Sequence, residues 1–141
     1  MGVKLYYEDF EIGMTYPIFE YAISAEDMEL HRASYDYTLE GMEDTAPSAS
    51  EKVISPFAIN SFLAMRSVIA MPDGVLHARE TLHLHSPAYV ADRLHVELSV
   101  LDKYERNGRP FLVFRHRVTR DKGDPVMDID RTVCWLRKGN Q

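Results

Sequence analysis

Cysteine is almost absent from this sequence: Cys134 is the single cysteine among 141 residues. One cysteine excludes an internal disulfide framework and any cysteine-rich zinc module. Long hydrophobic runs are missing as well, since the most apolar stretch, residues 56–71, is too short to cross a bilayer and contains Arg66. Nor does an apolar segment of signal-peptide length precede the acids Glu8 and Asp9. We therefore expect a cytoplasmic protein that is not attached to a membrane.

Positive charge is in deficit: 16 Lys and Arg face 22 Asp and Glu, which gives a net charge of −6. This balance excludes nucleic acid as the main partner, because phosphate binding requires a net basic face. The deficit is uneven, since residues 1–99 hold 6 basic and 16 acidic side chains whereas residues 100–141 hold 10 and 6. The basic part either faces an anionic ligand or lines the solvent face of the last strands.

Length and composition predict one globular domain over residues 1–141, with 45% hydrophobic and 27% charged residues. Most of the chain is predicted to be β-structure, because short segments alternate polar and apolar residues between turn signals. Asn107 and Gly108 predict a tight hairpin, since both tolerate a positive φ. The expected strands of an antiparallel sheet, about five in number, span residues 16–23, 79–85, 93–101, 111–120 and 126–136.

A first helix is predicted between the first two strands. Ser24 and Asp27 form a capping-box pattern, in which the serine oxygen and the acid satisfy backbone N–H groups at the helix start. The helix is expected over about residues 25–34, and its spacing places His31 and Tyr35 on one side.

A second helix is predicted over about residues 56–70. Ser55 is a suitable N-cap, and Pro56 fits the first helical position, where its missing N–H costs nothing. The segment is apolar nearly all round, which is typical of a helix buried on most sides. We therefore expect the sheet to wrap around this helix.

The order of these elements, together with four motifs, resembles the MaoC-like acyl-thioester hydratases and dehydratases, which have the hotdog fold. Residues 7–13 are similar to that family's Y-x-D-F-x-x-G pattern, and residues 86–94 to its R-P-V-x-x-G-D-x-L turn. Residues 33–36 stand where the family has its S-G-D turn, and residues 53–57 where its central helix begins. The resemblance implies an α+β hotdog domain, with a curved antiparallel sheet wrapped around a long central helix.

The resemblance also implies a catalytic site around Asp36, which matches the aspartate of the family's G-D-x-N-P-x-H stretch. Gly41 occupies the position of the family histidine, and Tyr35 replaces the glycine before the aspartate. His31 either takes over the role of the missing histidine or is a half-buried histidine with its tip in solvent. Asp36 either acts as a base, with Tyr35 beside it, or hydrogen-bonds its own backbone in a turn.

Four residues of the predicted central helix are expected to bind substrate. The N–H groups of Phe57 and Ala58 would polarise a thioester carbonyl, because the start of a helix carries unpaired donors and partial positive charge. Asn60 and Ser61 either hydrogen-bond the thioester or a water, or they form a buried polar pair bonded to the backbone.

Metal and cofactor chemistry are not predicted. His83 and His85 have period-two spacing, which places both rings on one face of a strand and would suit a metal ion. No third ligand is identifiable, so we interpret the pair as exposed strand histidines. No cofactor is expected either.

Three functions follow from the resemblance. The first is a lyase that hydrates or dehydrates an acyl thioester of CoA or a carrier protein, with Asp36 as the main polar group. The second is a catalytically silent hotdog subunit that binds acyl thioesters or completes the tunnel of an active hydratase. The third is a thioesterase or biosynthetic tailoring enzyme that uses Asp36 or an acid within residues 40–51. A homodimer, a higher homo-oligomer or a hotdog heteromer is expected, because one domain leaves a sheet edge unpaired.

Overall fold

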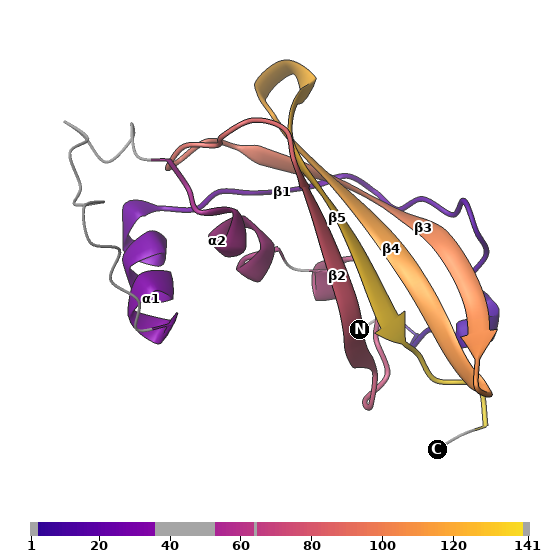
Figure 1. Cartoon of the computed structure of the whole chain (residues 1–141). Helices are drawn as coiled ribbons and strands as arrows, with labels where there is room; N and C mark the ends of the chain where they lie inside the picture. The colour runs from indigo at the N-terminus through magenta and orange to yellow at the C-terminus, as the bar shows by residue number, and fades with distance from the viewer. Residues whose placement is uncertain (1–2, 36–52, 64, 140–141) are drawn as a thin grey trace.

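The computed structural model describes residues 3–35, 53–63 and 65–139, and its main feature is a five-stranded sheet (Figure 1). The strands run in the spatial order β1-β3-β4-β5-β2, and every neighbouring pair is antiparallel. The predicted number and direction of the strands are thereby confirmed. The strands are β1 Phe19–Tyr21, β2 Leu76–Leu84, β3 Leu94–Arg106, β4 Arg109–Arg120 and β5 Asp124–Cys134.

The two longest strands, β3 and β4, form because their residues alternate between the two faces of the sheet. Along β3, Leu94, Val96 and Leu98 are buried, while the residues between them are more exposed. The strands join at Asn107 and Gly108, whose φ angles of 53° and 75° are the positive values that a tight hairpin requires. The predicted hairpin is therefore present, and it directs one buried stripe of each strand to the same face.

The helical segments begin where the sequence predicts. At the start of α1, the Asp27 N–H donates to Ser24 Oγ and the Ser24 N–H donates to an Asp27 carboxylate oxygen, each at 3.0 Å. The Phe57 N–H donates to Ser55 Oγ at the start of α2. The helices are α1 Ala25–Tyr35 and α2 Pro56–Ser61, with 3-10 turns η1 Tyr7–Asp9, η3 Met65–Ser67 and η4 Asp121–Gly123.

The predicted helix over residues 56–70 is only partly present among the described residues. Helix α2 ends at Ser61, and Met65–Ser67 forms a separate 3-10 turn. Asn60 and Ser61 have weak helix preference, and both side chains bond to groups outside the helix, which accounts for an end at this point. One side of α2 is open to solvent, because Phe57 is 69% exposed and Ser61, one turn later, is exposed as well, while Ala58 and Ile59 are buried.

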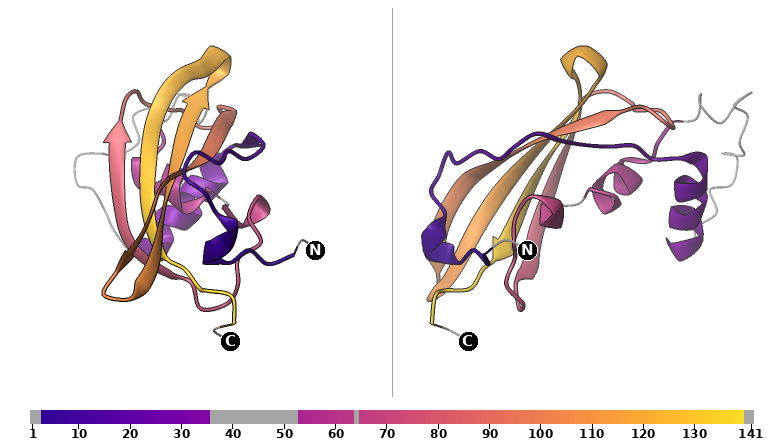
Figure 2. Two further views of the ribbon diagram at one scale, coloured as in Figure 1. Left: turned by 90° about the vertical axis from the view of Figure 1, so that its right-hand side faces the viewer. Right: turned by 180° about the vertical axis from the view of Figure 1, so that it is seen from behind.

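The sheet curves over α2 and η3, which lie against one of its faces, whereas α1 lies beyond α2 and away from the sheet (Figures 1 and 2). Three aromatic rings fill the core at the other end of this face. The Phe10 ring meets Phe114 and Trp135 edge-on, with centroid distances of 5.6 and 5.1 Å. The Trp135 indole N–H donates to the Leu5 carbonyl at 2.9 Å, which holds the N-terminal segment against the sheet.

The two edges of the sheet differ in length. At one edge β1 pairs with β3 over three residues, whereas the other edge is β2, a strand of nine residues. No strand in the described part of the chain pairs with the outer side of β2, so its backbone groups on that side have no ladder partner there. Within residues 3–35, 53–63 and 65–139, no helix is long and apolar enough to cross a membrane.

Candidate functional site

The start of α2 is capped by its own chain. The Phe57 N–H donates to Ser55 Oγ at 3.2 Å, and the N–H groups of Ala58 and Ile59 donate to the Ser55 carbonyl at 3.0 and 3.1 Å. The donors that were expected to polarise a thioester carbonyl are thus engaged by Ser55, and a substrate carbonyl would compete with this cap. The Ala58 side chain is fully buried, while that of Phe57 points to solvent.

An apolar pocket of about 300 Å³ lies beside this end of α2. The segment that precedes the helix is fixed there, because the Ile54 N–H donates to the Ala88 carbonyl at 2.8 Å and Val53 forms a β-bridge with Tyr89. The pocket therefore sits between the start of α2 and the turn that follows β2. It is lined by Val53, Ile54, Pro56, Ile59, Leu84, His85, Ser86, Pro87, Ala88, Val126 and Met127.

At the other end of α2, Asn60 lies in a network with two charged residues of the sheet. Its amide N–H donates to Glu80 on β2, and its amide oxygen accepts from Arg131 on β5. The Arg131 Nε also donates to Glu80 at 2.9 Å, so the three side chains form a closed triangle. The alternative of a polar pair bonded to the backbone is wrong for Asn60, because its side chain bonds to charged side chains. Its role in binding a thioester or a water stays a prediction.

Glu80 and Arg131 are site residues that sequence reasoning missed. They are register partners in the β2–β5 pair, and their side chains are 21% and 15% exposed. Each interrupts an inward stripe: Glu80 precedes Leu82 by two positions, and Arg131 lies between Ile129 and Val133. Two opposite charges, one at an inward position of each strand of the pair, are the sequence signal that could have identified these residues.

His31 of α1 meets Ser61 of α2 within the helical layer. The His31 Nε2 lies 3.3 Å from Ser61 Oγ, and the ring is tilted against Phe62 with a centroid distance of 6.2 Å. His31 is only 6% exposed, so the alternative of an imidazole tip in solvent is wrong. The structure thus brings two of the predicted site residues, His31 and Ser61, into contact.

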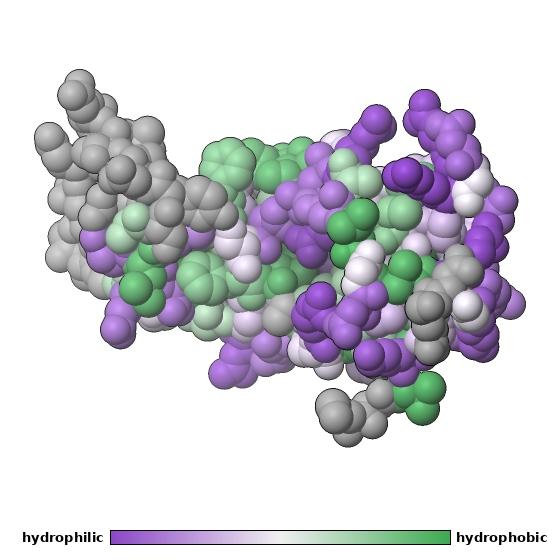
Figure 3. All heavy atoms as spheres, turned by 90° about the horizontal axis from the view of Figure 1, so that it is seen from below, coloured by the Kyte–Doolittle hydropathy of each residue, from purple (hydrophilic) through white to green (hydrophobic). Residues whose placement is uncertain are grey.

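A second, more polar pocket of about 510 Å³ lies at the end of α2, beside the polar triangle and Ser61. Asn60, Ser61, Glu80 and Arg131 contribute to its wall. The rest of the wall is Leu63, Met65, Arg66, Met71, Val75, His77 and Val133. The underside of the molecule shows hydrophobic residues gathered in the region of α2 and hydrophilic residues dominating the end with the β3–β4 hairpin (Figure 3). The candidate site therefore consists of an apolar pocket at one end of α2 and a charged one at the other.

His116 on β4 is a further buried polar residue that the sequence analysis did not single out. It is fully buried, its Nδ1 lies 3.3 Å from the Ile129 carbonyl, and its Nε2 has no partner among the described residues. Burial, helped by the nearby positive charge of Arg131, lowers the pKa of His116 to about 4. The sequence signal that could have identified His116 is its place in the inward stripe of β4, between Phe114 and Val118.

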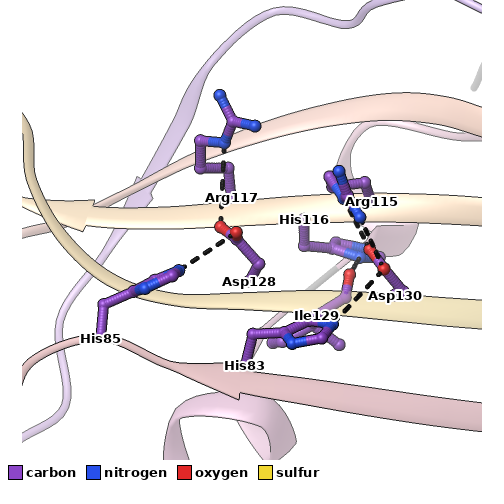
Figure 4. A network of polar contacts seen from close by, with 8 residues as sticks. All are labelled: His83, His85, Arg115, His116, Arg117, Asp128, Ile129 and Asp130. Atoms are coloured by element: carbon purple, nitrogen blue, oxygen red, sulfur yellow. Dashed lines mark hydrogen bonds and ion pairs between the residues drawn. The ribbon is translucent and has the colours of Figure 1, made fainter.

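The two strand histidines lie on the outer face of the sheet (Figure 4). The Nε2 of His83 is 3.9 Å from an Asp130 carboxylate oxygen, and that of His85 is 3.1 Å from Asp128. No group of three or more potential metal ligands occurs in the part of the chain that the structure describes. Each ring therefore faces a carboxylate of β5, and His85 also contributes to the wall of the apolar pocket at the start of α2.

The remaining predicted catalytic residues cannot be placed in this site. Asp36 and Gly41 lie outside the described residues, as do residues 40–51, which contain the alternative acids. Tyr35 ends α1, but its side chain also lies outside what the structure describes. Their roles stay predictions.

A curved antiparallel sheet over a helix defines the hotdog class, and solved structures of this class match the chain. The R-hydratase PhaJ1 from Pseudomonas aeruginosa matches with a TM-score of 0.74 and 22% identity, over 96% of this chain and 88% of that one. A MaoC-like dehydratase from Rhodospirillum rubrum matches with 0.72 and 18%, over 94% and 98%. The HadBC (3R-hydroxyacyl-ACP dehydratase) complex from Mycobacterium tuberculosis matches with 0.64 and 17%, over 86% and 95%. The expected hotdog fold is confirmed.

The family is given by the sequence itself. The family model of the FAS1-like dehydratase domain region matches residues 11–129. The chain belongs to this dehydratase-domain family, and the MaoC-like relationship expected from its motifs is confirmed. Comparison with curated protein sequences found no match.

Proposed function

We propose that this protein acts on acyl thioesters as a member of the hydratase and dehydratase class. The observation that carries this proposal is the family match over residues 11–129. The apolar pocket at the start of α2 supports it, because an acyl chain needs an apolar cavity with polar groups near the reacting carbonyl. CoA and a carrier protein are the two carriers that the proposal allows.

Hydration adds the oxygen of water to the β-carbon of an enoyl thioester and a proton to its α-carbon. We assign Asp36 to the first proton transfer: its carboxylate takes a proton from the water as the C–O bond forms. The same carboxyl then returns that proton to the α-carbon, and dehydration runs through these steps in reverse. His31, which is buried against Ser61, is the second group assigned to the site.

An Asp36→Asn variant tests this assignment. We expect its rate with short- and medium-chain enoyl-CoA substrates to fall about 10²–10⁴-fold, because a general base is lost while the shape is kept. The rate is measured as the loss of conjugated-thioester absorbance. Asp73→Asn is the control, since the Asp73 side chain is 99% exposed and its removal should leave the rate unchanged. Equal rates for wild type and Asp36→Asn would remove Asp36 from the mechanism.

A catalytically silent subunit is the second function that specific observations favour. Gly41 stands where the family has its histidine, the outer side of β2 has no described ladder partner, and Phe57 is exposed beside the apolar pocket. HadBC, a structural match, is named as a complex of a dehydratase. We therefore also propose that the chain pairs through β2, either with itself or with an active hotdog protein.

Activity with and without a partner separates the two functions. The chain is purified alone and together with a hotdog protein encoded beside it that retains the D-x-N-P-x-H stretch. Hydratase activity of the chain alone, abolished by Asp36→Asn, supports the first function. Activity that appears only in the mixture and survives Asp36→Asn supports the second. If neither acyl-CoA nor an acyl-carrier-protein thioester binds either preparation, both functions are wrong.

A further inference from the structure

Basic and acidic side chains are paired across neighbouring strands in the middle of the outer sheet face (Figure 4). Arg115 on β4 donates two hydrogen bonds of 2.8 Å to Asp130 on β5, and it holds the pKa of that carboxyl below its usual value. Arg117 on β4 lies 3.8 Å from Asp128 on β5. The arginines of this region therefore have their countercharges within the sheet.

The end of the same face, at the β3–β4 hairpin, departs from this pattern. Arg106 and Arg109 stand directly opposite each other across the hairpin, and Arg79 on β2 stands opposite Thr132 on β5. Because strand residues alternate, position 132 continues the outward series of positions 128 and 130, and it holds a neutral threonine where those hold aspartates. None of the three arginines has an ion-pair partner among the described residues.

This concentration of positive charge is unfavourable in the free protein. Like charges that face each other across an antiparallel pair destabilise it. Glu105, the acid next to Arg106, is engaged by Arg137 and does not neutralise the group. An anion would supply the missing countercharge, and guanidinium groups bind phosphate oxygens with two parallel hydrogen bonds.

The three arginines share a pocket of about 520 Å³ with Thr132 and two aromatic rings. The rings of Tyr104 and Phe111 are stacked, with an interplanar angle of 17° and a centroid distance of 5.3 Å. Both rings are half-buried. Aromatic side chains of this kind stack on nucleotide bases whatever the base, so the pocket combines phosphate-binding groups with a base-binding surface.

We propose that this pocket binds a nucleotide that carries at least two phosphate groups. The guanidinium groups of Arg79, Arg106 and Arg109 hold the phosphates, and the base stacks against the pair of rings. The pocket has the volume of a small-molecule site. The nucleotide end of CoA and a free nucleoside diphosphate share this chemistry. The pocket lies on the outer face, away from α2, so the proposal does not rest on the proposed acyl-thioester chemistry.

Isothermal titration calorimetry of the full chain tests the site with four probes: 3′-phosphoadenosine 5′-phosphate, ADP, adenosine and pyrophosphate. We expect at least one of the two nucleotides to bind at least tenfold more tightly than adenosine or pyrophosphate. Arg109→Ala should weaken nucleotide binding at least tenfold. Tyr104→Leu should weaken nucleotide binding but leave pyrophosphate binding within twofold. Arg93→Ala is the matched control, because its side chain is 70% exposed and distant from the pocket, and it should change affinity less than twofold.

The outcomes are distinguishable, provided that circular dichroism shows each variant folded. Tighter binding of 3′-phosphoadenosine 5′-phosphate identifies the CoA source, and tighter binding of ADP identifies a free nucleotide; both support the site. Three results would overturn the proposal: no nucleotide binding at millimolar concentration, pyrophosphate binding as tight as nucleotide binding, or equal effects of Arg109→Ala and Arg93→Ala. Loss of enoyl-CoA hydration by Asp36→Asn bears on the proposed function and leaves this test unaffected.

Discussion

At the scale of single residues, the face of the sheet that packs on α2 carries polar groups that are buried or largely buried. His116 is buried with one ring nitrogen that has no partner in the described chain, and Glu80, Arg131 and Asn60 form a closed polar triangle. Buried polar groups lower stability unless they are paired, so each has a measurable energetic consequence.

His116 makes the stability of the protein depend on pH. In the unfolded chain its imidazole has the ordinary pKa of 6.5, whereas in the folded chain the pKa is about 4. As the pH falls, the unfolded chain takes up the proton first. The free energy of unfolding that depends on a neutral His116 is therefore fully present above pH 6.5 and is lost progressively down to pH 4. At about pH 5 we expect a loss of ~2 kcal/mol relative to neutral pH.

Urea denaturation of wild type and His116→Gln at neutral pH and at about pH 5 measures this loss. The variant cannot titrate at this position, so its free energy of unfolding should fall less over the same interval. His95→Gln is the control for the substitution itself, because it makes the same change at a histidine that is partly exposed. An identical loss in wild type and His116→Gln would contradict the prediction.

The Glu80–Arg131 pair should behave as a coupled unit. Glu80→Leu leaves the Arg131 charge partly buried without its carboxylate, and we expect it to lower the free energy of unfolding by ~2 kcal/mol, reduced from the fully buried case by the residual exposure. Arg131→Met should lower the free energy of unfolding by a similar amount, because it leaves the Glu80 carboxylate partly buried without its guanidinium partner. The double variant should cost less than the sum of the two by ~1 kcal/mol or more, as measured by urea denaturation. Additive effects would show that the pair is not coupled.

At the scale of elements, local signals were sufficient for the strands and insufficient for α2. The β3–β4 hairpin follows from alternation and from Asn107 and Gly108, all of which act within a few residues. The end of α2 depends on where Asn60 finds Glu80 and Arg131, and this is decided by a strand pairing distant in sequence. Helix preference alone therefore predicted too long a helix.

The candidate site also has a part that nearby residues determine and a part that depends on contacts between distant segments. The capping serine, Ser55, and the helix start were predictable because they lie next to each other in sequence. The contact between His31 and Ser61 and the burial of His116 depend on how separate elements pack. The charges of the outer face were visible in the sequence as a basic final segment, but the division into paired and unpaired arginines needed the strand register.

The β3–β4 hairpin should become more stable when its opposed charges are removed. Arg109→Thr eliminates the like-charge contact with Arg106, and we expect the free energy of unfolding to rise by ~0.5 kcal/mol, which is a Tm increase of about 1–2 °C. Arg115→Thr is the matched change at a paired arginine and should lower the Tm, because it removes the partner of Asp130. Thermal unfolding in low salt without nucleotide measures both. A lower Tm for Arg109→Thr would show that the arginine is structural.

At the scale of the whole molecule, the domain is asymmetric at its edges. The β1 edge is short, whereas the β2 edge offers nine residues that no described strand covers, with exposed Leu76 and Leu84 at its two ends. An edge of this length without a partner favours pairing with another chain. Two β2 strands that pair in an antiparallel manner would bring these leucines to the same interface.

Introducing a positive charge at this edge should weaken self-association. We expect Leu76→Lys and Leu84→Lys, made together, to raise the dimer dissociation constant at least tenfold, which corresponds to about 1.4 kcal/mol. Analytical ultracentrifugation over a concentration series gives this constant. Leu30→Lys on α1 is the control, because Leu30 is 61% exposed, close to the 63% and 62% of Leu76 and Leu84. A wild type that stays monomeric throughout the series would contradict pairing of identical chains.

The bond between the Trp135 indole and the Leu5 carbonyl gives the protein a built-in optical reporter. Trp135 is the single tryptophan of the sequence, and it is almost fully buried against Phe10 and Phe114. Its fluorescence should therefore be blue-shifted in the native state and should move to longer wavelength when the N-terminal segment detaches from the sheet. Release of that segment can thus be followed in the unmodified chain, without attaching a dye.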